Sequence, residues 1–277
     1  AKRRKSGQRT ARENLDDLLD AGSFIEYGAM ALAAQRRRRS PEELRELSPA
    51  DGLISGIGTV NAGDFGPQAA RCMAIAYDYT VFAGTQGMMN HKKTDRMLGL
   101  AEQLRLPLVL FAEGGGGRPG DTDFVGVAGL DAHTFASMAR LSGLVPLVGV
   151  VSGRCFAGNA ALLGCCDVII ATRDASIGMA GPAMIEGGGL GSFSAEQVGP
   201  VSVQGPNGVI DILVKDEAAA VQAAKQYLAY FQGPLPDWQC ADQRLLRQLI
   251  PQNRLRVYDI RQLIETHPDL ADGHAPI

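Results

Sequence analysis

What this sequence lacks excludes several classes of protein. Its five cysteines include no Cys-x-x-Cys pair, so the usual spacing of a zinc site or a thioredoxin-type motif is missing. No apolar run approaches the length of a membrane span, because glycine, proline or charge interrupts each one. The basic N-terminal residues are not followed by the apolar region of a secretory signal. We therefore expect a cytoplasmic protein with reduced, buried thiols, no metal site and no membrane partner.

Charge and short motifs exclude further functions. The formal net charge of −3 gives no reason to expect a nucleic-acid partner. The sequence contains neither a Gly-x-x-x-x-Gly-Lys-[Ser/Thr] loop nor a Gly-x-Ser-x-Gly turn, and its four histidines form no triad-like arrangement. Basic residues cluster at 2–5 and 36–39. Each cluster is either a solvated surface or a site of attraction for an anionic ligand such as a nucleotide phosphate.

The most informative stretch is residues 113–121, which holds a run of four glycines at 114–117 and directly follows the apolar residues 107–112. Residues 107–112 have the length and composition of a buried strand. Consecutive glycines cannot stabilise a regular element, but they permit positive φ and close approach of backbone N–H groups to a ligand. Taken alone, the run is either a flexible loop or a ligand-binding turn.

A second copy of this pattern favours the ligand-binding turn. Residues 141–158 repeat the order of helix end, proline, apolar strand and glycine turn, and residues 167–172 form a third apolar run. Helices that alternate with β-branched runs indicate crossover units, hence an α/β fold with a largely parallel sheet. Two neighbouring strands would then present backbone N–H groups at one edge of the sheet.

Helix signals frame these strands. Residues 10–13 have the form of a capping box, with a hydroxyl followed three residues later by a carboxylate. Residues 88–104 carry apolar side chains largely at helical spacing, and residues 215–231 predict a second long helix with a broad apolar side. Residues 23–27 alternate weakly and predict an edge strand.

Backbone N–H groups at the glycine turns have two plausible uses. Phosphate binding is one, but the near match to Gly-x-Gly-x-x-Gly at residues 115–120 has no acidic partner, and Pro119 interrupts it. The other is an oxyanion hole for a thioester oxygen, in which one donor is worth roughly 10²–10³ in rate. The sequence favours the oxyanion hole.

Several side chains near the turns carry groups that can act in catalysis or bind a metal. Glu113, Asp121 and Asp123 could act as acid, base or metal ligands, although capping and turn hydrogen bonds suit them better. Cys155 is a candidate nucleophile, but a small buried thiol fits its surroundings better. His91 is expected to be a polar surface or ligand-lining residue rather than a base.

Six segments, in the right order, resemble the carboxyltransferase component of biotin-dependent acyl-CoA carboxylases, in the crotonase superfamily. The resemblance runs from about residue 10 to residue 231. Residues 113–121 are similar to the branch found in single-chain, multidomain long-chain acyl-CoA carboxylases. The segments are residues 10–26, residues 51–62, residues 78–85 with the following lysines, residues 113–118, residues 155–160, and residues 180–182 with 208–211.

The resemblance implies a fold and a reaction. The expected fold is the ClpP-like spiral of β-β-α units, with a crotonase-like domain at residues 1–232 and a tail or linker toward a missing second domain at residues 233–277. The implied reaction transfers CO₂ from carboxybiotin to the α carbon of an acyl-CoA through a thioester enolate. We expect the chain to be one domain of a longer protein, and the acyl chain length is not fixed by its sequence.

The resemblance also implies site residues and partners. The thioester oxyanion donors would be Gly115, Gly116 and Gly117. Partners would be biotin carboxyl carrier and biotin carboxylase domains and a second carboxyltransferase domain, in a homo-oligomer. The substrate-binding residues would be Arg118, Ala157, Gly158, Lys92, Lys93 and Arg37.

Two other functions stay open. A related crotonase that acts alone, as a hydratase, isomerase or decarboxylase, would need a side-chain acid or base, with Glu113 or Asp121 as the first candidates. A non-catalytic module that binds coenzyme A and serves in assembly is the other.

Overall fold

The computed structural model describes residues 2–5, 7–123, 133–234, 244, 247 and 250–260. The chain divides into two compact units, Ala1–Gly233 and Pro234–Ile277. The first unit holds the sheet, its helices and the glycine turns. Within the described residues, no helix combines the length and the apolar character needed to cross a membrane.

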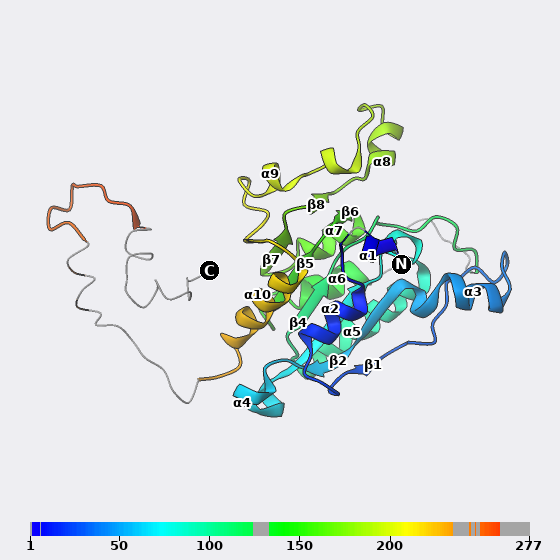
Figure 1. Ribbon diagram of the computed structural model, residues 1–277, viewed down its shortest axis with the longest axis horizontal. Helices are drawn as coiled ribbons and strands as arrows, with labels where there is room; N and C mark the ends of the chain where they lie inside the picture. The colour runs from blue at the N-terminus through cyan, green and yellow to red at the C-terminus, as the bar shows by residue number, and fades with distance from the viewer. Residues whose placement is uncertain are drawn as a thin grey trace. The chain divides into compact units, whose positions relative to one another are not determined.

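A seven-stranded sheet lies at the centre of the first unit, in the order β1-β2-β3-β4-β5-β7-β9 (Figure 1). The first three strands pair antiparallel, and those from β3 onward pair parallel, as the sequence predicts. The edge strand predicted at residues 23–27 is present as β1. The strands are β1 (Ile25–Glu26), β2 (Leu53–Thr59), β3 (Arg71–Tyr77), β4 (Leu108–Phe111), β5 (Leu147–Val151), β7 (Val168–Thr172) and β9 (Ile212–Val214).

Helices cover both faces of this sheet (Figure 1). One face packs against α2 (Ala11–Leu18) and α10 (Glu217–Ala229), and the other against α5 (Met88–Leu104), α6 (Thr134–Arg140) and α7 (Gly158–Leu163). Every residue of β4, β5 and β7 is therefore buried. Burial on both faces explains why the sequences of these strands are unbroken apolar runs and do not alternate between apolar and polar residues.

Local chemistry sets the helix boundaries. Thr10 Oγ1 accepts from Glu13 N at 3.2 Å, and Glu13 Oε2 accepts from Thr10 N at 2.8 Å, so the predicted capping box begins α2. The predicted bounds of α5 are also confirmed. The helix ends at Leu104, and the next residue, Arg105, adopts a left-handed backbone with φ of 53°.

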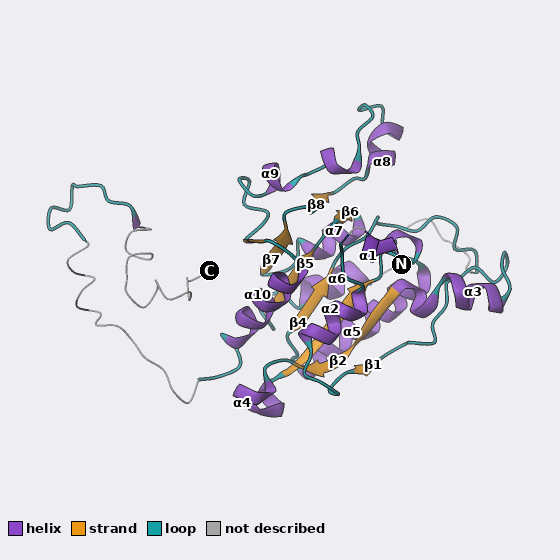
Figure 2. Cartoon of the chain, in the orientation of Figure 1, coloured by secondary structure: helices purple, strands orange, loops and turns teal. Residues whose placement is uncertain are grey.

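The remaining elements are short. Residues 154–156 lie in the glycine turn predicted at the end of residues 141–158, but they form strand β6, which pairs parallel with β8 in a separate two-stranded sheet. The segment that carries α8 and α9 extends away from the central sheet (Figure 2). The short elements are α1 (Lys2–Lys5), α3 (Pro41–Leu47), η1 (Pro49–Gly52), α4 (Ala62–Ala69), η2 (Phe82–Gly84), β6 (Arg154–Phe156), β8 (Ser176–Gly178), α8 (Pro182–Gly187), η3 (Ala195–Gln197) and α9 (Val201–Gln204).

Candidate functional site

The two glycine turns meet at one edge of the sheet, as predicted. They follow β4 and β5, which are adjacent and parallel. Gly114 N donates to Arg154 O at 2.8 Å, and Phe156 N donates to Gly114 O at 2.9 Å. A strand-like pair of bonds therefore joins the first turn to the second just beyond the ends of the two strands.

The structure narrows the set of N–H groups that a ligand can reach. Gly115 N donates to Ala83 O at 3.0 Å, and Gly116 N donates to Asn159 Oδ1 at 3.0 Å. Both are thus engaged within the protein, which corrects their assignment as oxyanion donors. Gly117 N has no acceptor among the described residues, and a Cβ added to Gly117 would meet nothing within 4 Å. Gly117 is the open donor of the run.

Gly116, Ala157 and Gly158 lie in contact. Gly116 has φ of +86°, and a Cβ added to it would lie 2.6 Å from Ala157 Cβ and 3.5 Å from Gly158 N. Ala157 itself has φ of 50° and ψ of −119°, a conformation that L residues rarely adopt. Gly158 N, at the start of α7, likewise has no acceptor among the residues that the structure describes. The second turn thus places the N–H group of Gly158 close to Gly116 of the first turn.

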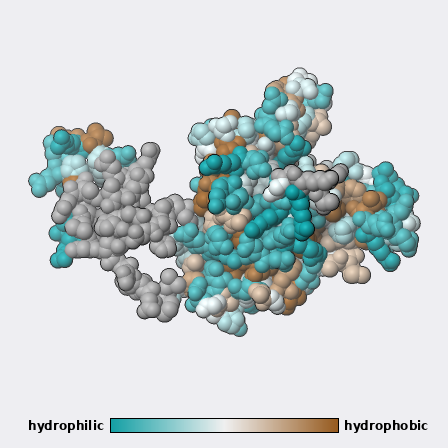
Figure 3. All heavy atoms as spheres, in the orientation of Figure 1, coloured by the Kyte–Doolittle hydropathy of each residue, from teal (hydrophilic) through white to brown (hydrophobic). Residues whose placement is uncertain are grey.

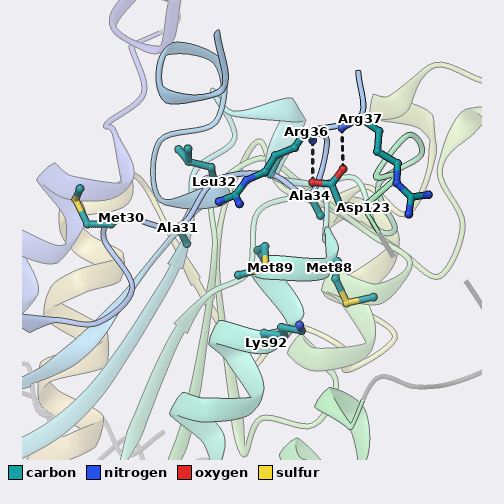
Figure 4. A pocket seen from close by; sticks show the side chains of 11 residues that line it. Met30, Ala31, Leu32, Ala34, Arg36, Arg37, Met88, Met89, Lys92 and Asp123 are labelled. Carbon is teal, nitrogen blue, oxygen red and sulfur yellow. Dashed lines mark hydrogen bonds between the residues drawn. The ribbon is translucent and has the colours of Figure 1, made fainter. Parts of the chain in front are cut away.

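A cavity of about 560 Å³ lies at the amino end of α5 (Figure 4). Hydrophobic residues also gather on the surface beside α3 (Figure 3). Asp123 accepts from Arg36 N at 2.8 Å and Arg37 N at 3.0 Å, which holds this part of the cavity wall. The cavity combines thioether and aliphatic groups with cations. Its lining residues are Met30, Ala31, Leu32, Ala33, Ala34, Arg36, Arg37, Met88, Met89, Lys92 and Asp123.

Asp121 connects the cavity to the glycine run. Its Oδ2 accepts from Met88 N, the first residue of α5, at 2.8 Å, and its Oδ1 accepts from Gln35 Nε2 at 3.0 Å. Met88 lines the cavity, and Asp121 follows the glycines closely in sequence. The predicted Lys92 and Arg37 therefore share one cavity near the glycine turns.

The Lys93 side chain points away from the cavity, and this corrects its assignment as a substrate-binding residue. It is buried, and its Nζ donates to Ala50 O at 2.8 Å and also to Leu53 O. Burial lowers the pKa of Lys93 to about 8. Because successive helix residues point about 100° apart, Lys92 faces the cavity while Lys93 supports the backbone at the start of β2.

The lowered pKa of Lys93 predicts a pH-dependent stability. Its folded pKa of about 8 lies below the ordinary 10.5, so the unfolded chain holds the proton more tightly. Stability should therefore rise as pH increases from about 8 to about 10.5, by up to about 3 kcal/mol. Urea unfolding at pH 7.5 and pH 10 measures this, with Lys93→Met as the variant that loses the rise. An equal rise in both proteins would show that Lys93 does not cause it.

Arg118 also serves the fold, which corrects its assignment to the substrate. Its side chain is 2% exposed and pairs with Asp51, which is 0% exposed. It donates to Thr85 O at 2.9 Å, and its guanidinium lies 4.9 Å from the centre of the Phe82 ring. The guanidinium of Arg118 thus joins the loops around residues 51, 82–85 and 118.

The side chains considered as acid, base or nucleophile are buried or bonded within the protein. Glu113 Oε2 lies 2.7 Å from Arg3 Nη1, and burial raises the pKa of Glu113 to about 7. Asp121 accepts the two bonds described above. Burial raises the pKa of the Cys155 thiol well above its ordinary value. His91 Nδ1 lies 2.9 Å from Thr134 Oγ1, and burial lowers its pKa. Among the described residues, no group of three or more His, Cys, Asp or Glu side chains could hold a metal ion.

The sequence alone does not reveal Asn159 and Gln86 as site residues. Both are buried, and both contact the glycine run from distant positions in the chain. Asn159 belongs to a segment that resembles the family, but its bond to Gly116 spans 43 residues. No local pattern signals such a contact, because it depends on how β4, β5 and α7 pack.

Comparisons with known proteins agree on one family. The chain matches the carboxyl transferase domain over residues 2–274. A solved single-chain, multi-domain long-chain acyl-CoA carboxylase is 64% identical with a TM-score of 0.87, over 95% of this chain and 26% of that chain. The biotin-dependent long chain acyl-coenzyme A carboxylase beta4 subunit of Mycobacterium tuberculosis is 30% identical over 83% of this chain and 41% of its own length.

A second solved structure extends the comparison. Transcarboxylase 12S, with methylmalonyl-coenzyme A and methylmalonic acid bound, is 26% identical with a TM-score of 0.75, over 96% of this chain and 51% of that chain. The chain thus spans about half, or less, of the length of these relatives.

Proposed function

The chain belongs to the carboxyl transferase domain family, and from this we propose that it is the half of an acyl-CoA carboxyltransferase that binds the acyl-CoA. It would hold the thioester oxygen while CO₂ is added to the α carbon. One observation supports this proposal: where the glycine turns meet, Gly117 N and Gly158 N have no acceptor among the described residues. Relatives named as acyl-CoA carboxylases support the substrate class.

In the proposed reaction, negative charge develops on the thioester oxygen, and the N–H groups of Gly117 and Gly158 would stabilise it. When the α carbon loses a proton, charge moves onto the thioester oxygen, and fixed N–H groups stabilise it. The α carbon then forms a bond to CO₂, and the thioester carbonyl is restored. Carboxybiotin, carried on a partner domain, would supply the CO₂ and a base for the proton. Glu113 and Asp121 are bonded within the protein, and the Cys155 thiol is buried, which fits a base that comes from outside this chain.

The cavity at the amino end of α5 suits the rest of the substrate. Arg36, Arg37 and Lys92 would attract the phosphates of coenzyme A, and the methionines and Leu32 would contact its less polar parts. Because the cavity lies next to Asp121, one ligand would be able to extend from Arg37 and Lys92 to Gly117.

Removing one cavity cation should weaken binding. We expect Arg37→Gln to lower acyl-CoA affinity about tenfold, equivalent to about 1.4 kcal/mol, by calorimetry at low salt. The difference should shrink as salt is added, because exposed charges are screened. Arg38→Gln is the matched control, since Arg38 belongs to the same basic run but donates to Gly120 O at 3.1 Å. Equal losses in both variants would contradict a specific phosphate contact.

The proposed function is tested by binding and then by turnover. Calorimetry of this chain with an acyl-CoA should show binding, and carboxylation should require a supplied second carboxyltransferase domain and biotin. Turnover by the chain alone, without biotin, would favour a crotonase that acts by itself. Binding without turnover in the completed enzyme would favour a non-catalytic module. No binding would overturn all three readings.

Partners and organisation follow from the same proposal. We expect biotin carboxyl carrier and biotin carboxylase domains, a second carboxyltransferase domain, and a homo-oligomer in the cytoplasm. Supporting this, the transcarboxylase 12S structure is described as a hexamer assembly. Residues 1–232 would form the crotonase-like domain, and residues 233–277 would lead toward the second domain.

A further inference from the structure

Asn159 is buried at the point where the two glycine turns meet. Its side chain is inaccessible to solvent, at 0% exposed, in the first turn of α7. Its Oδ1 accepts from Gly116 N at 3.0 Å, and its Nδ2 donates to Gly84 O at 3.3 Å. The side-chain carboxamide of Asn159 is therefore hydrogen-bonded both to the first glycine turn and to the loop that precedes α5.

The bond to Asn159 fixes one of the two peptide groups that flank Gly116. Gly116 N belongs to the peptide of residues 115 and 116, so its direction is set by Asn159 Oδ1. The neighbouring peptide, of residues 116 and 117, is held from its other end, because Gly116 O accepts from Gln86 N at 2.7 Å. Gln86 O in turn accepts from Arg118 N at 2.9 Å.

These bonds determine where Gly117 N points. A peptide group is planar and trans, so its N–H and C=O point in opposite directions. With Gly116 O held toward Gln86, Gly117 N must point away from Gln86. Gly117 is itself exposed. Without Asn159, Gly116 N would be an unpaired buried donor, and the turn would be free to rotate toward another acceptor.

We propose that Asn159 is a positioning residue for the thioester, one that occupies Gly116 N so that Gly117 N is the donor presented by the first turn. It also sets the distance between Gly117 and Gly158, because Asn159 directly follows Gly158. Asn159 acts through the backbone and does not touch the substrate. This inference rests on the proposed function, since it assumes that a thioester oxygen is the acceptor.

The first test needs no ligand. In protein labelled with ¹⁵N-glycine, the Gly116 amide should exchange with deuterium at least about tenfold more slowly than the Gly117 amide. The reason is that Gly116 N donates to Asn159, whereas Gly117 N has no acceptor among the described residues. In Asn159→Ala, Gly116 exchange should accelerate toward the Gly117 rate. Gly116 exchange as fast as that of Gly117 in the unmodified protein would overturn the inference, whether or not the variant folds.

The second test observes the substrate carbonyl. Infrared spectra of an acyl-CoA labelled with ¹³C at the thioester carbonyl should show a stretch shifted to lower frequency on binding. Asn159→Ala should move that stretch back toward the free value, while the dissociation constant changes by less than about threefold, because the cavity supplies most of the contacts.

A matched control separates this effect from a general loss of stability. Asn61 also bridges two partners, donating to Lys225 O at 2.9 Å and Gln232 Oε1 at 2.9 Å, but it follows β2 at the opposite edge of the sheet. Asn61→Gly should leave the carbonyl stretch unchanged. An unchanged stretch in Asn159→Ala would overturn the positioning role alone. An unmodified protein that binds no acyl-CoA would overturn the proposed function, and the positioning role with it.

Discussion

Replacing Gly116 by valine should abolish carboxylation in the enzyme completed by a second carboxyltransferase domain. Gly116 has φ of +86°, and even a Cβ would lie 2.6 Å from Ala157 Cβ, closer than such atoms approach. A β-branched side chain must push the two turns apart, and this moves the peptide that carries Gly117 N. Loss of one oxyanion donor costs roughly 10²–10³ in rate, and displacement of both turns should cost at least that.

The control for this prediction isolates backbone strain from the clash. Gly143 also has a positive φ, +73°, but a Cβ added there would meet nothing within 4 Å. Gly143→Val therefore introduces similar strain away from the turns and should keep its turnover. Circular dichroism would establish that both variants are folded. Near-normal turnover in Gly116→Val would show that the glycines form only a hinge.

Replacing Arg118 by methionine should lower the free energy of unfolding by about 3–5 kcal/mol, because Asp51 would be left as an unpaired charge in the interior. Arg118→Lys should rescue little, since an ammonium cannot reproduce the bonds to Asp51 and Thr85 O or the position over the Phe82 ring. Urea unfolding of the three proteins measures the effect.

An exposed ion pair provides the comparison. Arg140 pairs with Glu102 at 3.4 Å, with side chains 56% and 37% exposed. Arg140→Met should therefore change the free energy of unfolding by at most about 1 kcal/mol. If Arg118→Met retained full stability but lost acyl-CoA binding, Arg118 would return to the substrate-binding set.

The sequence predicts those features that depend on local pattern. The capping box at Thr10, the bounds of α5 and the buried strands β4 and β5 each follow from residues close together in the chain. The meeting of the glycine turns also follows, because β4 and β5 are apolar runs joined by a crossover.

The roles of individual side chains follow less well, because they depend on long-range packing. Lys92 and Lys93 look equivalent in sequence, yet one lines the cavity and the other donates to carbonyls at residues 50 and 53. Arg118 resembles a substrate ligand until Asp51, 67 residues away, is found beside it. The same holds for the glycines, since partners from other loops decide which N–H stays open.

Binding of the thioester oxygen by Gly117 N can be observed directly. We would follow the Gly117 amide proton by NMR in ¹⁵N-glycine-labelled protein while an acyl-CoA is added, and repeat the titration with a thioether analogue that lacks the carbonyl. A new hydrogen bond should move the Gly117 amide proton downfield with the acyl-CoA only, while both ligands shift signals at the cavity. A Gly117 signal that responds equally to both ligands, or to neither, would contradict the oxyanion role of this turn.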